Sequence, residues 1–402
     1  MYYSRTLAEQ IVKASNTFPV ALITGPRQVG KTTVFEKIRE PQRSYVTLDD
    51  PQIRALAQTD PMLFLQTYEP PVLIDEVQYA PQLFPYIKML ADKQQQNGQF
   101  WLTGSQQFLL MKNVSESLAG RVAILELQGL SQAEKNQTEG LPFLPDTLKP
   151  NNRKPYSIKK IYETIIKGSF PKLHADRSVS LTLFYSSYLK TYIERDVRAL
   201  AQVADERAFL LFLKVAAART AQLLNYADMA KDVGVSEATI KSWLSVLHSS
   251  GLIFLLQPYH NNITARAIKT PKLYFFDTGL CAHLCGWSTV ETLSSGAMSG
   301  AFFETYVVSE IIKSHMHSSS NAQFYFYRDK EKNEIDLLIA RDGAFYPVEV
   351  KRSASPKEDD VRHFRLLDKL GVEKGKGAVV CMYENLLPLS REVTIVPVGY
   401  LG

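Results

Sequence analysis

The feature that most restricts the fold is an eight-residue match to GxxxxGK[ST], Gly25-Pro26-Arg27-Gln28-Val29-Gly30-Lys31-Thr32. It lies between an apolar, strand-like run, Val20–Thr24, and a helix-like run, Thr33–Arg39. Phosphate-binding loops join a strand to a helix in this way, because backbone N–H groups and the helix N-terminus hold phosphate oxygens. We therefore expect residues 25–33 to bind ATP, with Lys31 reaching the β- and γ-phosphates and Thr32 ligating Mg²⁺.

A second apolar run, Val72-Leu73-Ile74, ends in the two carboxylates Asp75 and Glu76. On a buried strand beside the phosphate loop, Asp75 would hold the Mg²⁺ shell, and Glu76 would orient or deprotonate the attacking water. The alternative is a pair of solvated carboxylates at the end of a strand. Because a Glu follows the Asp, the pattern favours hydrolysis over binding alone.

A third strand-like run, Phe100–Leu102, ends in Thr103-Gly104-Ser105. A hydroxyl there would be placed to sense the γ-phosphate, and we assign this role to Thr103 or Ser105. The alternative is that Gly104 and Ser105 only form a turn.

The spacing of apolar runs from Phe18 to Leu127 is typical of an α/β domain with a mostly parallel, buried sheet. The 402-residue chain is long enough for two or three domains. Several Pro, Gly and Asn residues between 136 and 155 indicate a linker or surface excursion. We therefore predict domains at residues 1–150, 151–295 and 296–402.

The formal net charge of +5 is ordinary, but its distribution is uneven. Residues 151–300 contain 18 Lys or Arg against 11 Asp or Glu. A basic segment is compatible with DNA binding, although a solvated face would look the same. No apolar run approaches membrane-spanning length, the first residues do not resemble a signal peptide, and three cysteines are too few for a disulfide framework, so we expect a cytoplasmic protein without a membrane partner.

The middle segment contains a helix-turn-helix pattern. Two helix-like runs flank Gly234, Ser236 is placed to cap the second one, and a strand-like run follows at Leu252–Leu256. This is a winged-helix pattern. The polar face of its second helix offers Thr239, Lys241 and Ser242 to DNA. With one charge among the three, packing or protein contact is an equal alternative.

The C-terminal segment contains two strand-like runs joined at Asp342-Gly343, and together they carry three charged side chains of interest. A hairpin would bring Asp336 beside Glu349 and Lys351, which lie two residues apart and therefore point to the same face. Asp336 and Glu349 could bind Mg²⁺ or Mn²⁺, Lys351 could position the water, and Glu304 could complete the metal shell. The alternative is three exposed charges on a structural hairpin.

The order of motifs resembles prokaryotic AAA-type ATPases that carry a C-terminal domain of uncharacterised function. The resemblance rests on TGPRQVGKTT, LDDP, LIDEVQYAP, LTGSQQF, SLAGR, YIERDV and PKLYFFDTGL, which span most of the chain. It implies an AAA+ core in which Asp75 and Glu76 form the Walker B pair and Ser105 lies in the first sensor region. It also marks Arg121 as a trans-acting or sensing arginine, and Glu194-Arg195-Asp196 as a motif; by charge spacing alone, each would be a surface group.

The positions of Asp336, Glu349 and Lys351 resemble the signature of the PD-(D/E)xK restriction-endonuclease-like fold. The expected architecture is thus an AAA+ P-loop domain, a helical and winged-helix domain, and an α/β endonuclease-like domain. An arginine acting across a subunit boundary requires a homo-oligomer, with a hexameric ring as one form. Three functions are compatible with these features: a DNA-associated motor or remodeller, which we favour, a nucleotide-controlled switch acting on proteins, and an ATP-gated nuclease.

Overall fold

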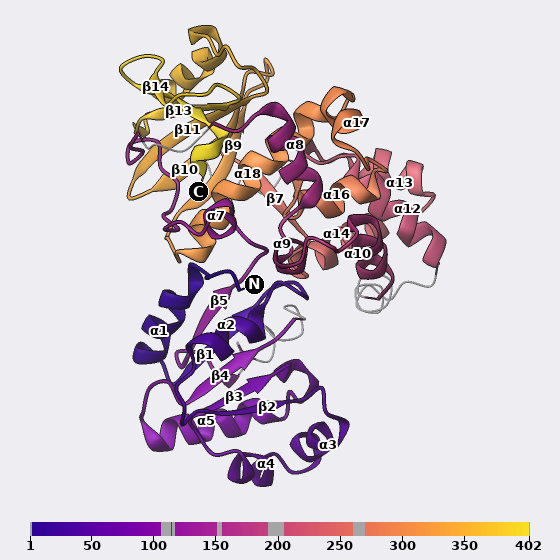
Figure 1. Cartoon of the computed structure of the whole chain (residues 1–402), viewed down its shortest axis with the longest axis vertical. Helices are drawn as coiled ribbons and strands as arrows, with labels where there is room; N and C mark the ends of the chain where they lie inside the picture. The colour runs from indigo at the N-terminus through magenta and orange to yellow at the C-terminus, as the bar shows by residue number, and fades with distance from the viewer. Residues whose placement is uncertain are drawn as a thin grey trace. The chain divides into compact units, whose positions relative to one another are not determined.

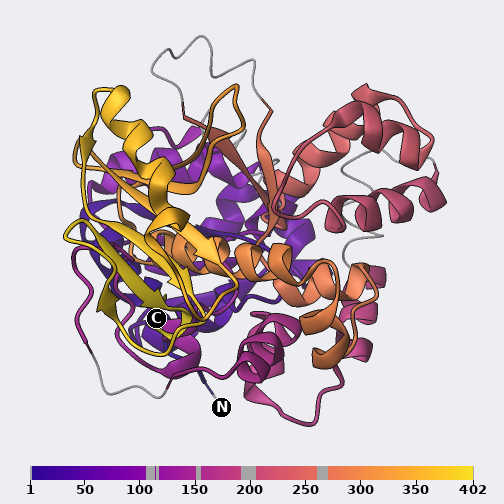
Figure 2. The ribbon, with the colours of Figure 1, turned by 90° about the horizontal axis from the view of Figure 1, so that it is seen from above.

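The computed structural model describes residues 2–105, 114, 117–150, 155–191, 205–259 and 270–401. The chain divides into two compact units (Figures 1 and 2). Unit 1 comprises residues 1–130 with the short segments 249–251 and 316–319, and unit 2 contains the remainder. Apart from residues 249–251 and 316–319, the predicted second and third domains, 151–295 and 296–402, lie in unit 2, and so do residues 131–150 of the predicted first domain.

Unit 1 is a parallel sheet with helices, and its strands lie in the order β2-β3-β4-β1-β5. The expected parallel α/β sheet is therefore present. Its elements are α1 (Leu7–Thr17), β1 (Val20–Thr24), α2 (Lys31–Ile38), β2 (Ser44–Thr47), α3 (Pro51–Thr59), α4 (Pro61–Thr67), β3 (Val72–Asp75), η1 (Val77–Tyr79), α5 (Leu83–Gln94), β4 (Phe100–Thr103) and β5 (Val122–Glu126).

The central strands β1, β3 and β4 of unit 1 are fully buried, which explains why they read as continuous apolar runs. Short helices begin at side-chain caps. Asp50 accepts hydrogen bonds from the first turn of α3, and Asp60 does the same for α4, in each case just before a proline. Because β4 lies between β1 and β3, the carboxyl ends of all three strands meet at one edge of the sheet.

Unit 2 contains a mixed sheet in the order β14-β15-β13-β11-β10-β9-β7-β8-β6, with β12 paired to β11. Its helices are α7 (Gln132–Asn136), α8 (Ile158–Lys167), α9 (Pro171–Ala175), α10 (Leu181–Tyr188), α12 (Glu206–Ala217), α13 (Tyr226–Val233), α14 (Glu237–Ser249), α16 (Thr278–Leu284), α17 (Val290–Ser295), α18 (Ser299–His317), η3 (Glu358–Arg365), α19 (Leu366–Lys369) and η4 (Val398–Leu401). Its strands are β6 (Gln222–Leu223), β7 (Ile253–Pro258), β8 (Lys272–Phe275), β9 (Gln323–Arg328), β10 (Glu334–Arg341), β11 (Ala344–Lys351), β12 (Glu373–Lys374), β13 (Gly377–Cys381), β14 (Leu387–Pro388) and β15 (Val393–Pro397).

Asp277, in the sequence PKLYFFDTGL, organises the helical part of unit 2. Its buried carboxylate accepts hydrogen bonds from the backbone of Leu280, the hydroxyl of Tyr185, and both the backbone N–H and the hydroxyl of Ser169, at 2.6–2.9 Å. Gly279 is required beside it, because a Cβ there would lie 2.1 Å from the Tyr185 hydroxyl. The motif therefore joins α10, α16 and the turn after α8.

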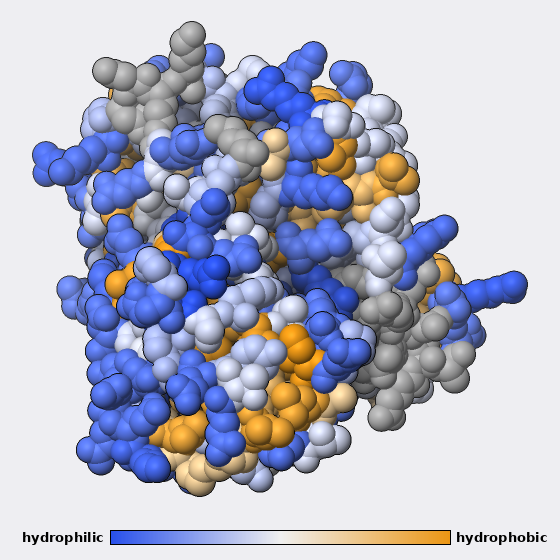
Figure 3. All heavy atoms as spheres, turned by 60° about the horizontal axis from the view of Figure 1, so that its bottom comes forward, coloured by the Kyte–Doolittle hydropathy of each residue, from blue (hydrophilic) through white to orange (hydrophobic). Residues whose placement is uncertain are grey.

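The surface is mixed in character. In the view of Figure 3, hydrophobic residues gather in patches between hydrophilic side chains. Large apolar side chains exposed on unit 1 include Tyr45, Leu63, Met89 and Ile124. Among the described residues, no helix is both long and apolar enough to cross a membrane.

Candidate nucleotide site and a second polar cluster

The loop between β1 and α2 has the backbone that its glycines allow. Gly25 has a φ of 138°, and a Cβ there would lie 2.1 Å from the carbonyl oxygen of Leu127. Gly30 has a φ of 93° immediately before α2, and Gln28 has a φ of 62°. Arg5, which lies before α1, donates to the carbonyls of Val29 and Gln128 at 2.7 and 2.6 Å. The loop is thus fixed from two sides.

Lys31 is buried at the first position of α2. Its ammonium donates to the carbonyls of Gly25 and Pro26 at 3.1 and 2.8 Å. Burial lowers the pKa of Lys31 to about 8, although Glu76 and Asp75 oppose this effect. The side chain is folded into the loop where phosphate oxygens would be held.

Asp75, at the end of β3, connects the loop to the neighbouring strands. Its Oδ1 accepts a 2.8 Å hydrogen bond from the Thr32 hydroxyl and another from the Thr103 hydroxyl, and its Oδ2 accepts one from Tyr45 at 3.3 Å. The Asp75 carboxylate and the Thr32 hydroxyl are hard oxygen ligands on adjacent elements. They fit Mg²⁺, which takes few protein ligands and keeps several waters.

Glu76 has a left-handed backbone, with φ 57° and ψ 45°, which turns the chain sharply after β3. Its N–H donates to the Thr103 hydroxyl at 3.1 Å. Its carboxylate accepts a 3.0 Å hydrogen bond from the Ser105 hydroxyl and another from the Gln78 amide. The carboxylate is therefore held in one orientation, as a residue that positions water must be.

The expected residues therefore come together at one edge of the sheet. Asp75 ends β3 and Glu76 follows it, and Thr103 ends β4 and Ser105 lies two residues beyond. The loop and first-turn positions that follow β1 are Gly25, Pro26, Arg27, Gln28, Val29, Gly30, Lys31, Thr32 and Thr33. The two hydroxyls bond separately, Thr103 to Asp75 and Ser105 to Glu76. Sequence reasoning missed Arg5 and Tyr45, which no motif marks, and it gave no role to Gln78, which lies within LIDEVQYAP.

Arg121 is placed differently. It directly precedes β5, and its neighbour Val122 is in register with Val20 at the start of β1, so it lies at the sheet edge opposite the phosphate loop. Its guanidinium is paired with Asp92 on α5 and donates to the carbonyl of Ala119 at 2.9 Å. The structure does not bring Arg121 to the nucleotide site of its own chain, and its pairing with Asp92 fits the alternative of a surface group.

We expect nucleotide affinity to decrease as the pH rises above about 8. Phosphate favours the charged ammonium of Lys31. Above the pKa that Lys31 has in the nucleotide-free chain, binding therefore requires uptake of a proton, and the affinity should fall by up to about ten-fold per pH unit. Titration calorimetry with ADP between pH 7 and 9.5 measures the slope. In a Lys31→Arg variant, whose guanidinium stays charged, the slope should disappear. Equal slopes would remove Lys31 from the phosphate contact.

The C-terminal hairpin, β10 and β11, brings together the second set of expected residues. Asp336 lies within a β-bulge of β10, between Ile335 and Leu338, and its Oδ2 accepts a 2.9 Å hydrogen bond from the N–H of Val350. Lys351 donates to Glu349 at 2.8 Å. Burial, followed by repulsion from Asp336, raises the pKa of Glu349 to about 8, and Glu349 Oε2 is buried without a hydrogen-bond partner.

Lys272, on β8, is the residue of this cluster that the sequence did not indicate. Its buried ammonium lies 3.1 Å from Glu304, 2.5 Å from Glu334 and 3.8 Å from Asp336. Burial opposes its charge, but Glu304, Asp336 and Glu334 together raise the pKa of Lys272 above its ordinary value. Glu304 also accepts a 2.7 Å hydrogen bond from Tyr274, and burial and Asp336 raise its pKa to about 7.

The cluster therefore holds a protein cation among the carboxylates that we expected to bind metal. Within the described ranges, no group of three or more His, Cys, Asp or Glu residues is arranged to hold a metal ion. Asp336, Glu349, Lys351 and Glu304 are neighbours as expected, yet Lys272 compensates the charge that a divalent cation would compensate.

The helix-turn-helix segment consists of α13 and α14, with Gly234 in the left-handed conformation at the end of α13. Ser236 accepts a hydrogen bond from the N–H of Thr239 at 3.1 Å. Lys241 and Ser242 are exposed on α14, and Ile240, Trp243 and Leu244 are buried. The Glu194-Arg195-Asp196 motif lies outside the described residues.

Three parts of the chain match family models. Residues 17–136 match a family described as an AAA domain. Residues 158–291 and 299–401 match two domains of unknown function, DUF8612 and DUF4143. Proteins from Mycobacterium bovis and Mycobacterium tuberculosis, both named as uncharacterized, are each 27% identical over 98% of this chain and 83% of their own length.

Solved structures show weaker likeness. The Walker-type ATPase of Pyrococcus abyssi has a TM-score of 0.45 at 13% identity, covering 69% of this chain and 94% of that one. The Holliday junction branch migration motor RuvB of Thermotoga maritima has a TM-score of 0.30 at 16% identity, covering 62% and 88%. These two likenesses are too weak to bear on function. Residues 17–136 thus match an AAA domain, and they contain the strand–loop–helix geometry of a phosphate-binding loop.

Proposed function

We propose that the chain binds and hydrolyses ATP with Mg²⁺ in unit 1. The observation that supports this most strongly is that the adjacent carboxylates Asp75 and Glu76 have separate hydrogen-bond partners. Asp75 accepts a hydrogen bond from the hydroxyl of Thr32 in the first turn of α2, and Ser105 and Gln78 orient Glu76. In this proposal Lys31 and the loop N–H groups bind the phosphates, and Thr32 and Asp75 hold Mg²⁺. Glu76 positions the water.

We further propose that hydrolysis is coupled to DNA, in a cytoplasmic homo-oligomer. Two features support the DNA proposal. The basic excess lies in residues 151–300. In addition, the order α12, β6, α13, α14, β7, β8, with β7 and β8 antiparallel, is compatible with the winged helix that we propose here. We propose the oligomer because Arg121 lies away from the nucleotide site of its own chain and could contact a phosphate only in a neighbouring subunit.

The test is ATP turnover by the purified chain with and without single-stranded, duplex and branched DNA, with Lys31→Ala as the blank. A DNA-coupled ATPase should be stimulated several-fold, and its DNA affinity should decrease steeply with salt, because phosphate contacts release counterions. Lys241→Glu on the exposed face of α14 should weaken DNA binding, and Lys330→Glu, a charge reversal at an exposed position outside residues 151–300, serves as the matched control. Turnover indifferent to every DNA would favour the alternative, a nucleotide-controlled switch acting on proteins.

The second candidate function is an ATP-gated nuclease. It is favoured by the proximity of Asp336, Glu349 and Lys351, and by the buried oxygen of Glu349 that lacks a hydrogen-bond partner. The presence of Lys272 among the carboxylates argues against a metal bound in this arrangement. Mg²⁺- or Mn²⁺-dependent DNA cleavage that Asp336→Ala abolishes would establish the nuclease, and its absence would exclude it.

A further inference from the structure

Unit 2 contains a cavity of about 570 Å³ that no part of the proposed ATPase uses. Helices α7, α8 and α9 and the segment before α17 line it. Its volume lies in the range of about 300–1,000 Å³ that is typical of small-molecule sites. The polar lining residues that matter here are Lys135, Lys160, Lys167, Glu163 and His174.

Most of the charged side chains in the wall of this cavity are basic. Three lysines face one carboxylate, Glu163. Burial, with a smaller contribution from Lys135, lowers the pKa of His174 to about 3. Burial, with smaller contributions from Lys160 and Arg177, lowers the pKa of Lys167. His174 is therefore neutral, and the positive charge of the cavity comes from the lysines.

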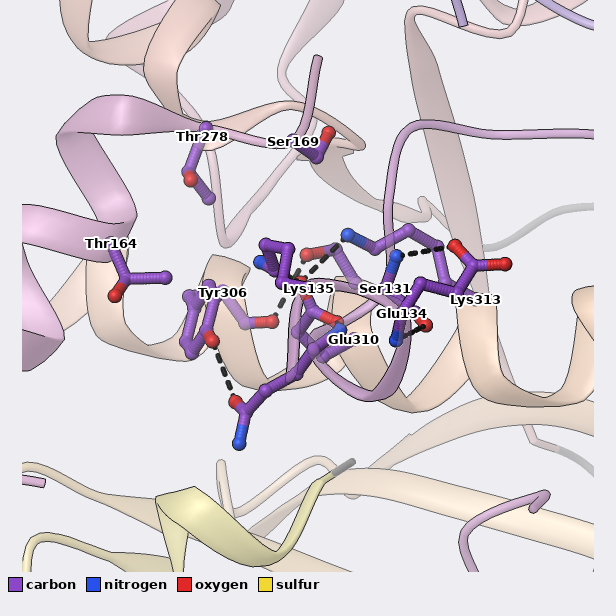
Figure 4. A network of polar contacts seen from close by, with 12 residues as sticks. Ser131, Glu134, Lys135, Thr164, Ser169, Thr278, Tyr306, Glu310 and Lys313 are labelled. Atoms are coloured by element: carbon purple, nitrogen blue, oxygen red, sulfur yellow. Dashed lines mark hydrogen bonds and ion pairs between the residues drawn. The ribbon is translucent and has the colours of Figure 1, made fainter. Parts of the chain in front are cut away.

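One of these lysines belongs to a rigid buried network, shown in Figure 4. The ammonium groups of Lys135 and Lys313 both donate to Glu310 Oε1, at 3.1 and 2.7 Å, and Glu310 Oε2 accepts from the N–H of Gln132 at 2.6 Å. The side chains of Lys135, Lys313 and Glu310 are 8%, 1% and 1% exposed. Tyr306 fixes Gln132 through a 2.6 Å hydrogen bond.

Stability does not explain such a network, because apolar side chains of the same volume are often equally stabilising or better. Two ammonium groups share one carboxylate. The other carboxylate that acts on Lys135, Asp277, gives its oxygens to Leu280, Tyr185 and Ser169. A bound anion would add negative charge to a cavity wall that carries three lysines and one carboxylate, Glu163.

We propose that this cavity binds a phosphate-bearing small molecule about the size of a nucleoside monophosphate. Lysine ammonium groups bind phosphate as point charges, and Lys135, Lys160 and Lys167 supply three of them. Ile166, Leu181 and Val290 line the same cavity and offer apolar contact, and Tyr156 offers a ring, to the uncharged part of the molecule. The site is independent of the nucleotide loop in unit 1.

The test uses the full chain carrying Lys31→Ala, so that the phosphate loop does not contribute. Titration calorimetry measures binding of AMP, which lacks the β-phosphate that Lys31 would contact, and of inorganic phosphate. Reversing Lys160 and Lys167 together to Glu should weaken AMP binding at least about ten-fold, because two favourable charges become repulsive. Lys159→Glu is the matched control: it lies on the same helix, is exposed, and does not line the cavity.

AMP binding that the double reversal weakens and the control does not would support the proposal. Absence of binding of both AMP and phosphate to the Lys31→Ala chain would overturn it, and so would AMP binding that the double reversal leaves unchanged. A single-stranded oligonucleotide forms the third arm. If it binds through Lys160 and Lys167 while AMP does not bind, the surface belongs to nucleic acid and the small-molecule proposal is wrong.

Discussion

ATP turnover by Glu76→Gln should fall at least about 100-fold while nucleotide affinity changes little, because a positioned general base typically contributes 10²–10⁴-fold. The amide retains the size of the side chain and can still accept from Ser105, so the geometry should persist. Lys31→Ala, in contrast, should lose binding, since its ammonium lies in the phosphate loop. Steady-state turnover and ADP calorimetry on each variant separate the two effects.

Glu36→Gln serves as the control for Glu76→Gln. It neutralises an exposed carboxylate on α2 of the same unit, outside the chain of hydrogen bonds at the strand ends. Its turnover should match that of the natural chain. If Glu76→Gln hydrolyses ATP at the natural rate, Glu76 has no part in water activation.

Lys272→Met should destabilise unit 2 by about 3–5 kcal/mol at pH 8, because removing one partner of a buried ion pair leaves uncompensated charge. Glu304, Glu334 and Asp336 would lose their shared counterion. The pKa of Glu304 is already raised to about 7, and loss of Lys272 raises it further. Burial also raises the pKa of Asp336, so Glu304 and Asp336 are protonated more readily in the folded variant than in the unfolded chain. The loss of stability should therefore shrink as the pH falls toward 5.

Thermal unfolding between pH 5 and 8 measures this loss, as a shift of about 2–4 °C per kcal/mol for a domain of 150–250 residues. Lys330→Met, at an exposed position before β10, is the control and should leave the midpoint unchanged. Added Mn²⁺ provides a second readout. If it restores the midpoint of Lys272→Met and leaves the natural chain unaffected, the ammonium occupies a place that a metal can take. An unchanged midpoint in Lys272→Met would show that the lysine is not needed to compensate the cluster.

Much of the nucleotide site could be predicted from the sequence because it is built from contiguous motifs at strand ends. A parallel sheet brings such ends to one edge, so the positions of Lys31, Asp75, Glu76 and Ser105 follow from the order of strands. Arg5 and Tyr45 could not be predicted in this way, because each reaches the site from a different part of the chain through one side chain.

In the C-terminal cluster too, a side chain from a distant part of the chain could not be predicted from local sequence. The proximity of Asp336, Glu349 and Lys351 follows from hairpin alternation, which is a local property. Lys272 enters from β8, which joins the hairpin only through β7 and β9, and nothing local relates it to Asp336 and Glu349. The metal site was expected because negative charges were visible in the sequence and their compensating cation was not.

The strand order of unit 1 has a consequence for synthesis on the ribosome. β1, which leads into the phosphate loop, is the first strand made, yet its neighbours in the sheet are β4 and β5, whose residues Phe100 and Val122 pair with Val20. Until those strands emerge, the apolar segment Val20–Thr24 has no edge to join. Long-range parallel pairing is slow and leaves apolar segments open to aggregation. In the nascent chain, the strand that leads into the nucleotide loop therefore stays unpaired until nearly all of unit 1 has left the exit tunnel.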